Sequence, residues 1–122
     1  MGNREQHRAS FALEKVEGVK SHSAKYKTQL LKLPARLHTN GLGQTVAFYL
    51  AAGKDSPEAK ICSWIECWLR DPRVGTYSPG QRLIVSITSG SEDAYRRASE
   101  EARALALWLK RFAEAFLEGG QE

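Results

Sequence analysis

The hydrophobic positions of this chain recur mainly at intervals of three and four residues, which is the spacing of one face of an α-helix. The pattern is clearest in the last third, between Ser91, a potential helix cap, and the pair Gly119-Gly120, a helix stop. The stripe consists of Tyr95, Ala98, Ala102, Leu105, Leu109, Phe112 and Phe116, widened by Trp108 and Ala115. It predicts an amphipathic helix about 40 Å long. We expect this stripe to form core and to leave some apolar surface for a partner.

The first part of the chain predicts two helices, over residues 4–19 and 23–38. The first has Phe11 and Val16 among its inward-facing positions. The second has an apolar face made of Tyr26, Leu30, Leu33 and Leu37. Because proline lacks an amide hydrogen and disfavours helical backbone in the residue before it, we expect a kink or a short break at Pro34. The tripeptide Thr39-Asn40-Gly41 predicts the end of this helix.

The middle of the chain predicts a short helix over residues 42–52 and a longer one over residues 57–70. The run Ser56-Pro57-Glu58 is a typical helix start, with a capping hydroxyl followed by proline in the first turn. The inward positions of the longer helix are Ile61, Ile65, Trp68 and Leu69, with Trp64 alongside. Residues 71–81 contain two prolines and two glycines and predict an exposed loop.

Residues 83–87, Leu-Ile-Val-Ser-Ile, fit two assignments. Their length and β-branched content suit a strand. However, the chain has no second strand-like run, and a lone strand would leave its backbone donors and acceptors without partners. We favour a short helix and keep the strand as the alternative.

The pattern as a whole predicts an all-α fold: a compact helical bundle of about five to six helices with a long C-terminal helix. The length of 122 residues suits one domain, residues 1–122, large enough to bury a core. Hydrophobic residues make up 42% and charged residues 26%, as in ordinary soluble proteins. Since the N-terminal residues are polar and no apolar run approaches a membrane span, we expect no signal peptide and a cytoplasmic protein.

Candidate chemistry is sparse. Cys62 and Cys67 are five residues apart, which on a helix places them about 140° apart, so they are expected neither to bridge nor to share a metal. We interpret both as small buried side chains in a reducing compartment. The three histidines have no metal-ligand spacing, and the glycine-rich residues 41–45 lack the lysine of a phosphate-binding loop. We therefore expect a structural role for both glycines, and no catalytic residue, metal or cofactor.

The charge distribution points to an anionic partner. The net charge is +4, and from Gly18 to Lys54 there is no Asp or Glu. The cations of this acid-free segment are Lys20, Lys25, Lys27, Lys32, Arg36 and Lys54. The other 85 residues hold the remaining 12 Lys and Arg and all 14 Asp and Glu. Such a basic patch is typical of phosphate binding, although chance clustering on a solvated face is the alternative.

The six cations are our predicted nucleic-acid contacts. Lys25, Lys32 and Arg36 fall on one helix face, with Lys20 and Lys27 expected to flank the row, and such a row meets phosphates without reading bases. A continuous helix would align all three, and a kink at Pro34 leaves the orientation of Arg36 open. The last helix carries further cations, but we expect nearby acids to neutralise most of them. These cations are Arg96, Arg97, Arg103, Lys110 and Arg111, and the acids are Glu92, Asp93, Glu100, Glu101 and Glu114.

Two blocks of sequence are specific when they are taken as a pair. The first is residues 26–35, Tyr-Lys-Thr-Gln-Leu-Leu-Lys-Leu-Pro-Ala, with residues 40–50, Asn-Gly-Leu-Gly-Gln-Thr-Val-Ala-Phe-Tyr-Leu. The second is Tyr95-Arg96, Glu101-Ala102 and residues 107–115, Leu-Trp-Leu-Lys-Arg-Phe-Ala-Glu-Ala. Together they resemble the small-subunit family of the Cmr (type III-B) CRISPR effector. The resemblance covers nearly the whole chain. Ala35 and Arg36 depart from it, because many relatives are more apolar there.

The resemblance implies a helical bundle without an active site of its own, acting in antiviral defence. Copies of such subunits stack along a filament of backbone subunits that holds the guide RNA, and they line the path of the target RNA. Guide–target pairing then reads the sequence while protein contacts the backbone. The implied partners are other Cmr subunits, copies of the chain itself, and guide and target RNA, with weak self-association of the isolated chain.

Three hypotheses follow. The first is a non-catalytic structural subunit that contacts RNA through the acid-free segment. The second is a helical protein–protein scaffold without direct RNA contact, whose basic face meets acidic patches on a neighbour. The third is a small hydrolase whose site has no local sequence signature.

Overall fold

The protein is all-helical in the computed structural model, which describes residues 3–119. Gly120, half of the predicted stop, lies outside that range. Five α-helices and one short 3₁₀ helix make up the described part, with no strand among them. Their bounds are α1 Arg4–Glu17, η1 Lys20–His22, α2 Ser23–Ala51, α3 Pro57–Leu69, α4 Leu83–Ser89 and α5 Glu92–Phe116. The predicted fold class and the long C-terminal helix are confirmed.

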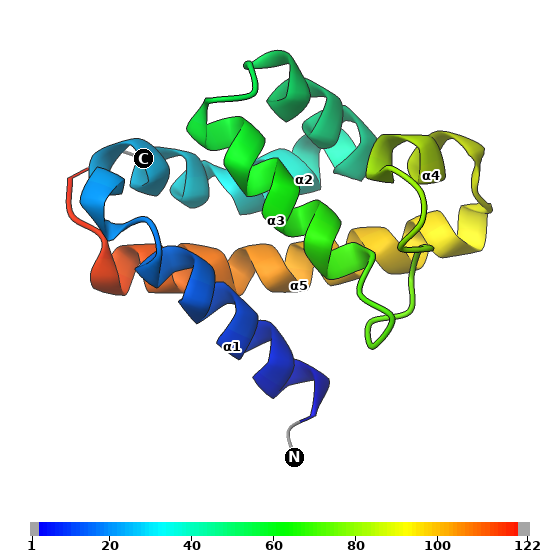
Figure 1. Ribbon diagram of the computed structural model, residues 1–122, viewed down its shortest axis with the longest axis horizontal. Helices are drawn as coiled ribbons and strands as arrows, with labels where there is room; N and C mark the ends of the chain where they lie inside the picture. The colour runs from blue at the N-terminus through cyan, green and yellow to red at the C-terminus, as the bar shows by residue number, and fades with distance from the viewer. Residues whose placement is uncertain (1–2, 120–122) are drawn as a thin grey trace.

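Helix α5 runs along the whole molecule, and the other elements are arranged around it (Figure 1). The first half of α2 lies beside α5 and runs in the opposite direction, while α1 packs diagonally against the C-terminal half of α5. Helix α3 packs on α2. The α2–α5 pair is therefore the main packing contact of the fold.

The buried apolar side chains form one cluster, and the predicted inward faces supply it. The buried members are Leu30, Leu33, Leu37 and Leu42 of α2, the predicted face of α3, and Ala98, Ala102, Leu105 and Leu109 of the α5 stripe. Ala115, which was predicted to widen the stripe, is exposed. Phe11 and Tyr26 pack at the edge, with ring centroids 5.0 Å from Trp68 and 5.9 Å from Trp64. The stripe of α5 ends at Phe116, which is 43% exposed. The sequence pattern thus predicted the core-facing side of each long helix.

The break in α2 is at Gly41 and not at Pro34. The backbone stays helical through Pro34, whereas Gly41 has φ 82° and ψ 165°. A proline inside a helix loses one hydrogen bond, but the buried leucines Leu30, Leu33 and Leu37 hold the helix together on both sides of it. Glycine alone adopts the Gly41 conformation readily, because it has no Cβ. The prediction of a short break at Pro34 was wrong, and the predicted end near Gly41 is confirmed.

The remaining boundaries agree closely with the predictions. The hydroxyls of Ser56 and Ser91 accept hydrogen bonds from backbone amides of the first turns of α3 and α5. Residues 83–87 are helical, and the amide of Leu83 donates to Glu66 Oε2 at 2.7 Å. The loop at 71–81 is mostly exposed, but Val74 is buried and so closes one side of the core.

The two cysteines differ in exposure. Both thiols are free, but Cys62 is buried while Cys67 is exposed, so the expectation that both are buried was wrong for Cys67. The five-residue spacing turns Cys67 to the solvent face of α3. Burial raises the pKa of the Cys62 thiol to about 11.

Candidate nucleic-acid interface

The six predicted RNA-contacting cations do not form one surface. Lys25, Lys32 and Arg36 lie on one flank of α2, because they are separated by seven and four residues of helix. Lys27 is two residues from Lys25 and therefore lies about 160° around the helix from it. The expectation that Lys27 flanks the row was wrong, since the buried leucine face of α2 separates the two flanks.

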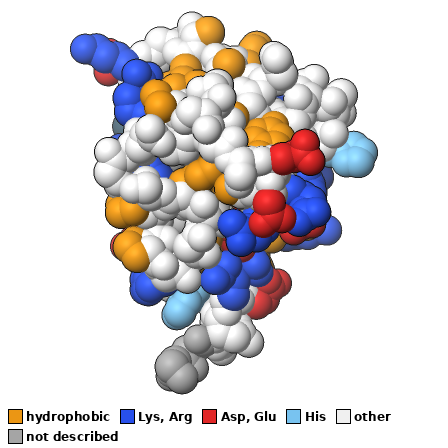
Figure 2. All heavy atoms as spheres, turned by 90° about the vertical axis from the view of Figure 1, so that its right-hand side faces the viewer, with side chains coloured by type: hydrophobic (Ala, Val, Ile, Leu, Met, Phe, Trp, Pro, Cys, Tyr) orange, Lys and Arg blue, Asp and Glu red, His pale blue; other side chains and the backbone are white. Residues whose placement is uncertain are grey.

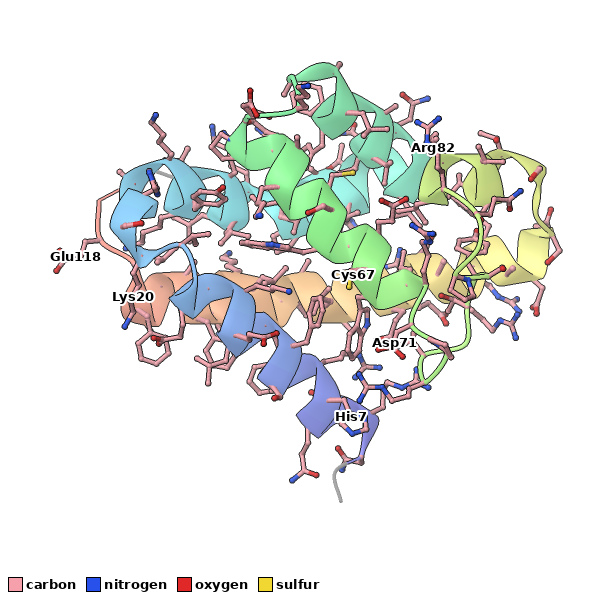
Figure 3. The ribbon with its side chains drawn as sticks, in the orientation of Figure 1. His7, Lys20, Cys67, Asp71, Arg82 and Glu118 are labelled. Carbon is pink, nitrogen blue, oxygen red and sulfur yellow. The ribbon has the colours of Figure 1, made fainter. Side chains whose placement is uncertain are left out.

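Lys20 and Lys54 lie away from the row. Lys20 is in the 3₁₀ helix, with its Nζ 3.1 Å from a Glu17 carboxylate oxygen and 5.6 Å from the Phe116 ring centroid. Figure 3 shows it beside the C-terminal end of α5. Lys54 is exposed in the connection between α2 and α3, on the side of the molecule away from α5 (Figure 1). Lys20 is thus neutralised by Glu17, and Lys54 is separate from the row on α2.

Arg36 is held by contacts within the chain. Its Nη1 donates to Gln29 Oε1 at 2.6 Å and to the hydroxyl of Tyr49 at 3.0 Å. The guanidinium also lies 5.1 Å from the ring centroid of Phe48. Since Phe48 and Tyr49 follow the Gly41 bend, Arg36 joins the two halves of α2. Among residues 3–119, its charge nevertheless has only uncharged partners.

The glycine-rich run at the bend is a packing motif, as expected. The amide of Gly43 donates to the hydroxyl of Tyr95 on α5 at 2.9 Å. The hydroxyl of Thr45 donates to the carbonyl of Arg36 at 3.1 Å. A Cβ at Gly41 or at Gly43 would lie 3.5 Å from the Tyr95 hydroxyl. The two sequence blocks, around Gly41 and around Tyr95, therefore meet in space, a contact that the sequence analysis did not foresee.

The cations of α5 fall into a paired and an unpaired group. Arg96 and Arg97 form ion pairs with Asp93, and Arg111 pairs with Glu114, as predicted. Acidic and basic side chains accordingly lie intermingled on the face at the α4 end of the molecule (Figure 2). Within residues 3–119, Arg103 and Lys110 have no ion pair. The same holds, over this part of the chain, for Lys25, Lys27, Lys32 and Lys54.

The α2 and α5 cations meet at a hollow of about 510 Å³, here called the α2–α5 hollow. Lys32 and Arg36 of α2 and Lys110 of α5 line it, together with Leu31 and Ala35. No Asp or Glu is among its lining residues in the described chain. The basic surface therefore spans two helices, and the sequence analysis missed the contribution of α5. The signal was the seven-residue spacing of Arg103 and Lys110, which matches that of Lys25 and Lys32.

Glu101 was predicted to neutralise surface cations but is buried. It is 7% exposed and accepts hydrogen bonds from Trp68 Nε1 at 2.9 Å and Arg4 Nη1 at 3.0 Å. Arg8 donates to both carboxylate oxygens. Burial alone would raise the pKa of Glu101, but the hydrogen bonds from Arg8, Trp68 and Arg4 lower it below its ordinary value. Glu101 thus joins α1 and α3 to α5 and does not neutralise the surface cations of α5.

In residues 3–119, no three His, Cys, Asp or Glu side chains lie together in a way that would hold a metal ion. In the same residues, no helix combines the length and apolar character needed to cross a membrane.

Comparison with known proteins assigns the family. The model of the family "CRISPR-associated protein (Cas_Cmr5)" matches residues 4–116. The chain belongs to this family. It is 31% identical over 124 residues to the "CRISPR system Cmr subunit Cmr5" of Thermus thermophilus, a match that covers 97% of this chain and 99% of the relative. The resemblance inferred from the two sequence blocks is therefore confirmed, and the family match includes both flanks of the α2–α5 hollow.

Proposed function

We propose that this member of the Cmr5 family is a non-catalytic structural subunit of a Cmr-type CRISPR complex and contacts the RNA backbone without sequence specificity. One observation supports the RNA contact. The α2–α5 hollow has no acid among its lining residues in the described chain, and unpaired cations extend from it along both helices. Those without an ion pair within residues 3–119 are Lys25 and Lys32 of α2 and Arg103 and Lys110 of α5. The relative named as a Cmr subunit supports membership in the complex.

A phosphate contact costs less free energy for an unpaired cation than for one in an ion pair. A lysine or arginine that already has a carboxylate partner must exchange it for phosphate, whereas an unpaired cation loses only water and a counterion. Lys25 and Lys32 are about 10 Å apart along α2. Cations spaced along a surface bind successive phosphates and leave sequence discrimination to guide–target pairing.

The proposed partners are other subunits of the complex, further copies of this chain, and guide and target RNA, all in the cytoplasm. Large apolar side chains remain exposed for the protein contacts. Phe48 is 57% exposed and Leu107 is 53% exposed. These residues are also the observation that favours the second candidate function, a helical scaffold without direct RNA contact.

Charge reversal on one flank of α2 tests the RNA contact. We expect Lys25→Glu/Lys32→Glu to abolish salt-sensitive RNA binding, because two unpaired cations of the row become anions. The matched control, Lys27→Glu/Lys54→Glu, makes the same change in net charge elsewhere and should retain most of the binding. Fluorescence anisotropy with labelled RNA, together with circular dichroism to verify the fold, measures both.

The outcomes separate the two candidate functions. Equal loss of binding in both double variants would show a response to net charge and not to this flank. If neither variant affects RNA retention while the chain still assembles with other Cmr subunits, the scaffold function is correct.

A further inference from the structure

The α2–α5 hollow combines three kinds of surface in a small area. Leu31 and Ala35 of α2 supply its apolar lining, here called the apolar floor, and Thr39 and Asn40, further along α2, also line it. The volume of about 510 Å³ lies within the range of small-ligand sites, roughly 300–1,000 Å³. The hollow is thus large enough to receive part of a ligand between the two helices.

The charge of the hollow selects an anion. Lys32 and Lys110 approach it from different helices, and within the described chain neither has an ion pair. Arg36 adds a third positive charge that is held in place by uncharged groups. Three cations around an apolar floor favour a ligand with both a phosphate and a planar or apolar part.

The lining of the hollow also offers hydrogen bonds. The side chains of Thr39 and Asn40 make no hydrogen bond within the described residues. A hydroxyl and an amide together present donors and acceptors, which suit a ribose or the edge of a base. The first half of α2 ends here, before Gly41, and the free carbonyls of a helix end carry partial negative charge. A phosphate would therefore lie towards Lys32 and Lys110, away from Asn40.

We propose that the α2–α5 hollow is a nucleotide-binding site that holds one nucleotide of the bound RNA strand. The phosphate lies between Lys32 and Lys110, and the base or ribose lies over Leu31 and Ala35 with its polar edge towards Thr39 and Asn40. This inference rests on the proposed RNA contact and adds a defined nucleotide-binding site that includes α5. An acidic protein segment would satisfy the cations through carboxylates, and the assembly experiment below distinguishes it from RNA.

Two substitutions test the nucleotide-binding site, one by removing a charge and the other by filling the hollow. Lys110→Ala removes one phosphate contact and should lower the salt-dependence slope of single-stranded RNA binding by about 0.7. Arg111→Ala, which removes a neighbouring arginine paired with Glu114, should leave the slope unchanged. Ala35→Phe fills the hollow without changing charge, so affinity should fall while the slope stays the same. Ala115→Phe, at an exposed position elsewhere on α5, is its control.

The measurement is fluorescence anisotropy of the full-length chain with labelled single-stranded RNA at several salt concentrations. One outcome is RNA binding that survives both Lys110→Ala and Ala35→Phe and yet is lost in Lys25→Glu/Lys32→Glu. That result overturns the nucleotide-binding site and leaves the proposed function intact. Absence of wild-type RNA binding, both alone and within the complex, overturns both. If Lys110→Ala and Ala35→Phe impair only assembly with protein subunits, the hollow binds an acidic protein segment and the proposed nucleotide-binding site is wrong.

Discussion

Among single residues, Glu101 connects three elements of the bundle. Its carboxylate accepts hydrogen bonds from Arg4 and Arg8 of α1 and from Trp68 of α3. A buried carboxylate is costly unless it is paired and hydrogen-bonded, and here four donated hydrogen bonds meet that requirement. The network positions the N-terminal helix against α5.

Replacement of Glu101 should destabilise the fold. We expect Glu101→Ala to lower the free energy of unfolding by about 3 kcal/mol, because it leaves Arg8 and the Trp68 indole without their acceptor. Glu101→Gln keeps the shape and an acceptor for Trp68, so its loss should be smaller. Urea unfolding followed by tryptophan fluorescence compares both variants with the wild type. Equal stability of Glu101→Ala and wild type would contradict the assigned role.

The same residue predicts a pH dependence. The pKa of Glu101 is lowered from its ordinary value of 4.5 in the folded state. Its charged form is therefore stabilised by folding, so its contribution is complete above the unfolded pKa and is lost as pH falls through the folded pKa. The stability difference between wild type and Glu101→Gln should be full at neutral pH and should shrink below about pH 4.5. Urea unfolding at several pH values measures the difference.

The cysteines give a prediction about reactivity. Cys62 is buried and its thiol pKa is raised to about 11, whereas Cys67 is exposed. Because the thiolate is the reactive form and needs access to reagent, iodoacetamide should label only Cys67 in the folded protein. Mass spectrometry of the labelled native chain should find one modified cysteine, and Cys67→Ser should remove the label. Rapid native labelling of Cys62 would show that the α3 face opens.

At the scale of elements, the bend of α2 organises the fold. The two halves of the helix meet at Gly41, and three hydrogen bonds connect the segments around it. Arg36 donates to Tyr49, Thr45 donates to the Arg36 carbonyl, and Gly43 donates to Tyr95 of α5. The bend therefore fixes both the direction of the second half of α2 and its contact with α5.

The two glycines of the bend should respond oppositely to alanine. Gly41 has a φ of 82°, so Gly41→Ala should cost about 1–3 kcal/mol in backbone strain. Gly43 has no positive φ, and an added Cβ would meet its neighbours at ordinary distances of 3.5 Å or more. Gly43→Ala should therefore be neutral or stabilising by up to about 1 kcal/mol. Thermal unfolding measures both, and a stable Gly41→Ala would show that the bend can form elsewhere.

At the scale of the whole molecule, the basic surface is a product of helix packing. The α5 arginines near Asp93 and Glu114 are neutralised by ion pairs, whereas Lys110 reaches the hollow beside Lys32. Cations that are adjacent in the acid-free segment, such as Lys25 and Lys27, point to opposite flanks of α2. Proximity in sequence was therefore a poor guide to proximity on the surface.

The sequence by itself determined the helices, their inward faces and the family. Helical periodicity and capping residues act over three or four positions, and apolar burial follows from them, so residues such as Leu30, Ile65 and Leu105 were placed correctly. The glycine-rich run and the tryptophan block of the last helix were specific enough to indicate the family.

Only the tertiary structure decided that α2 stays helical through Pro34, that Glu101 is buried, and which cations share a surface. Each of these depends on contacts between positions far apart in the chain, such as Glu101 with Arg8 and Lys32 with Lys110. Such contacts are set by how the helices pack around α5, because packing determines which side chains lose water and which find a partner. A local pattern carries no information about that choice.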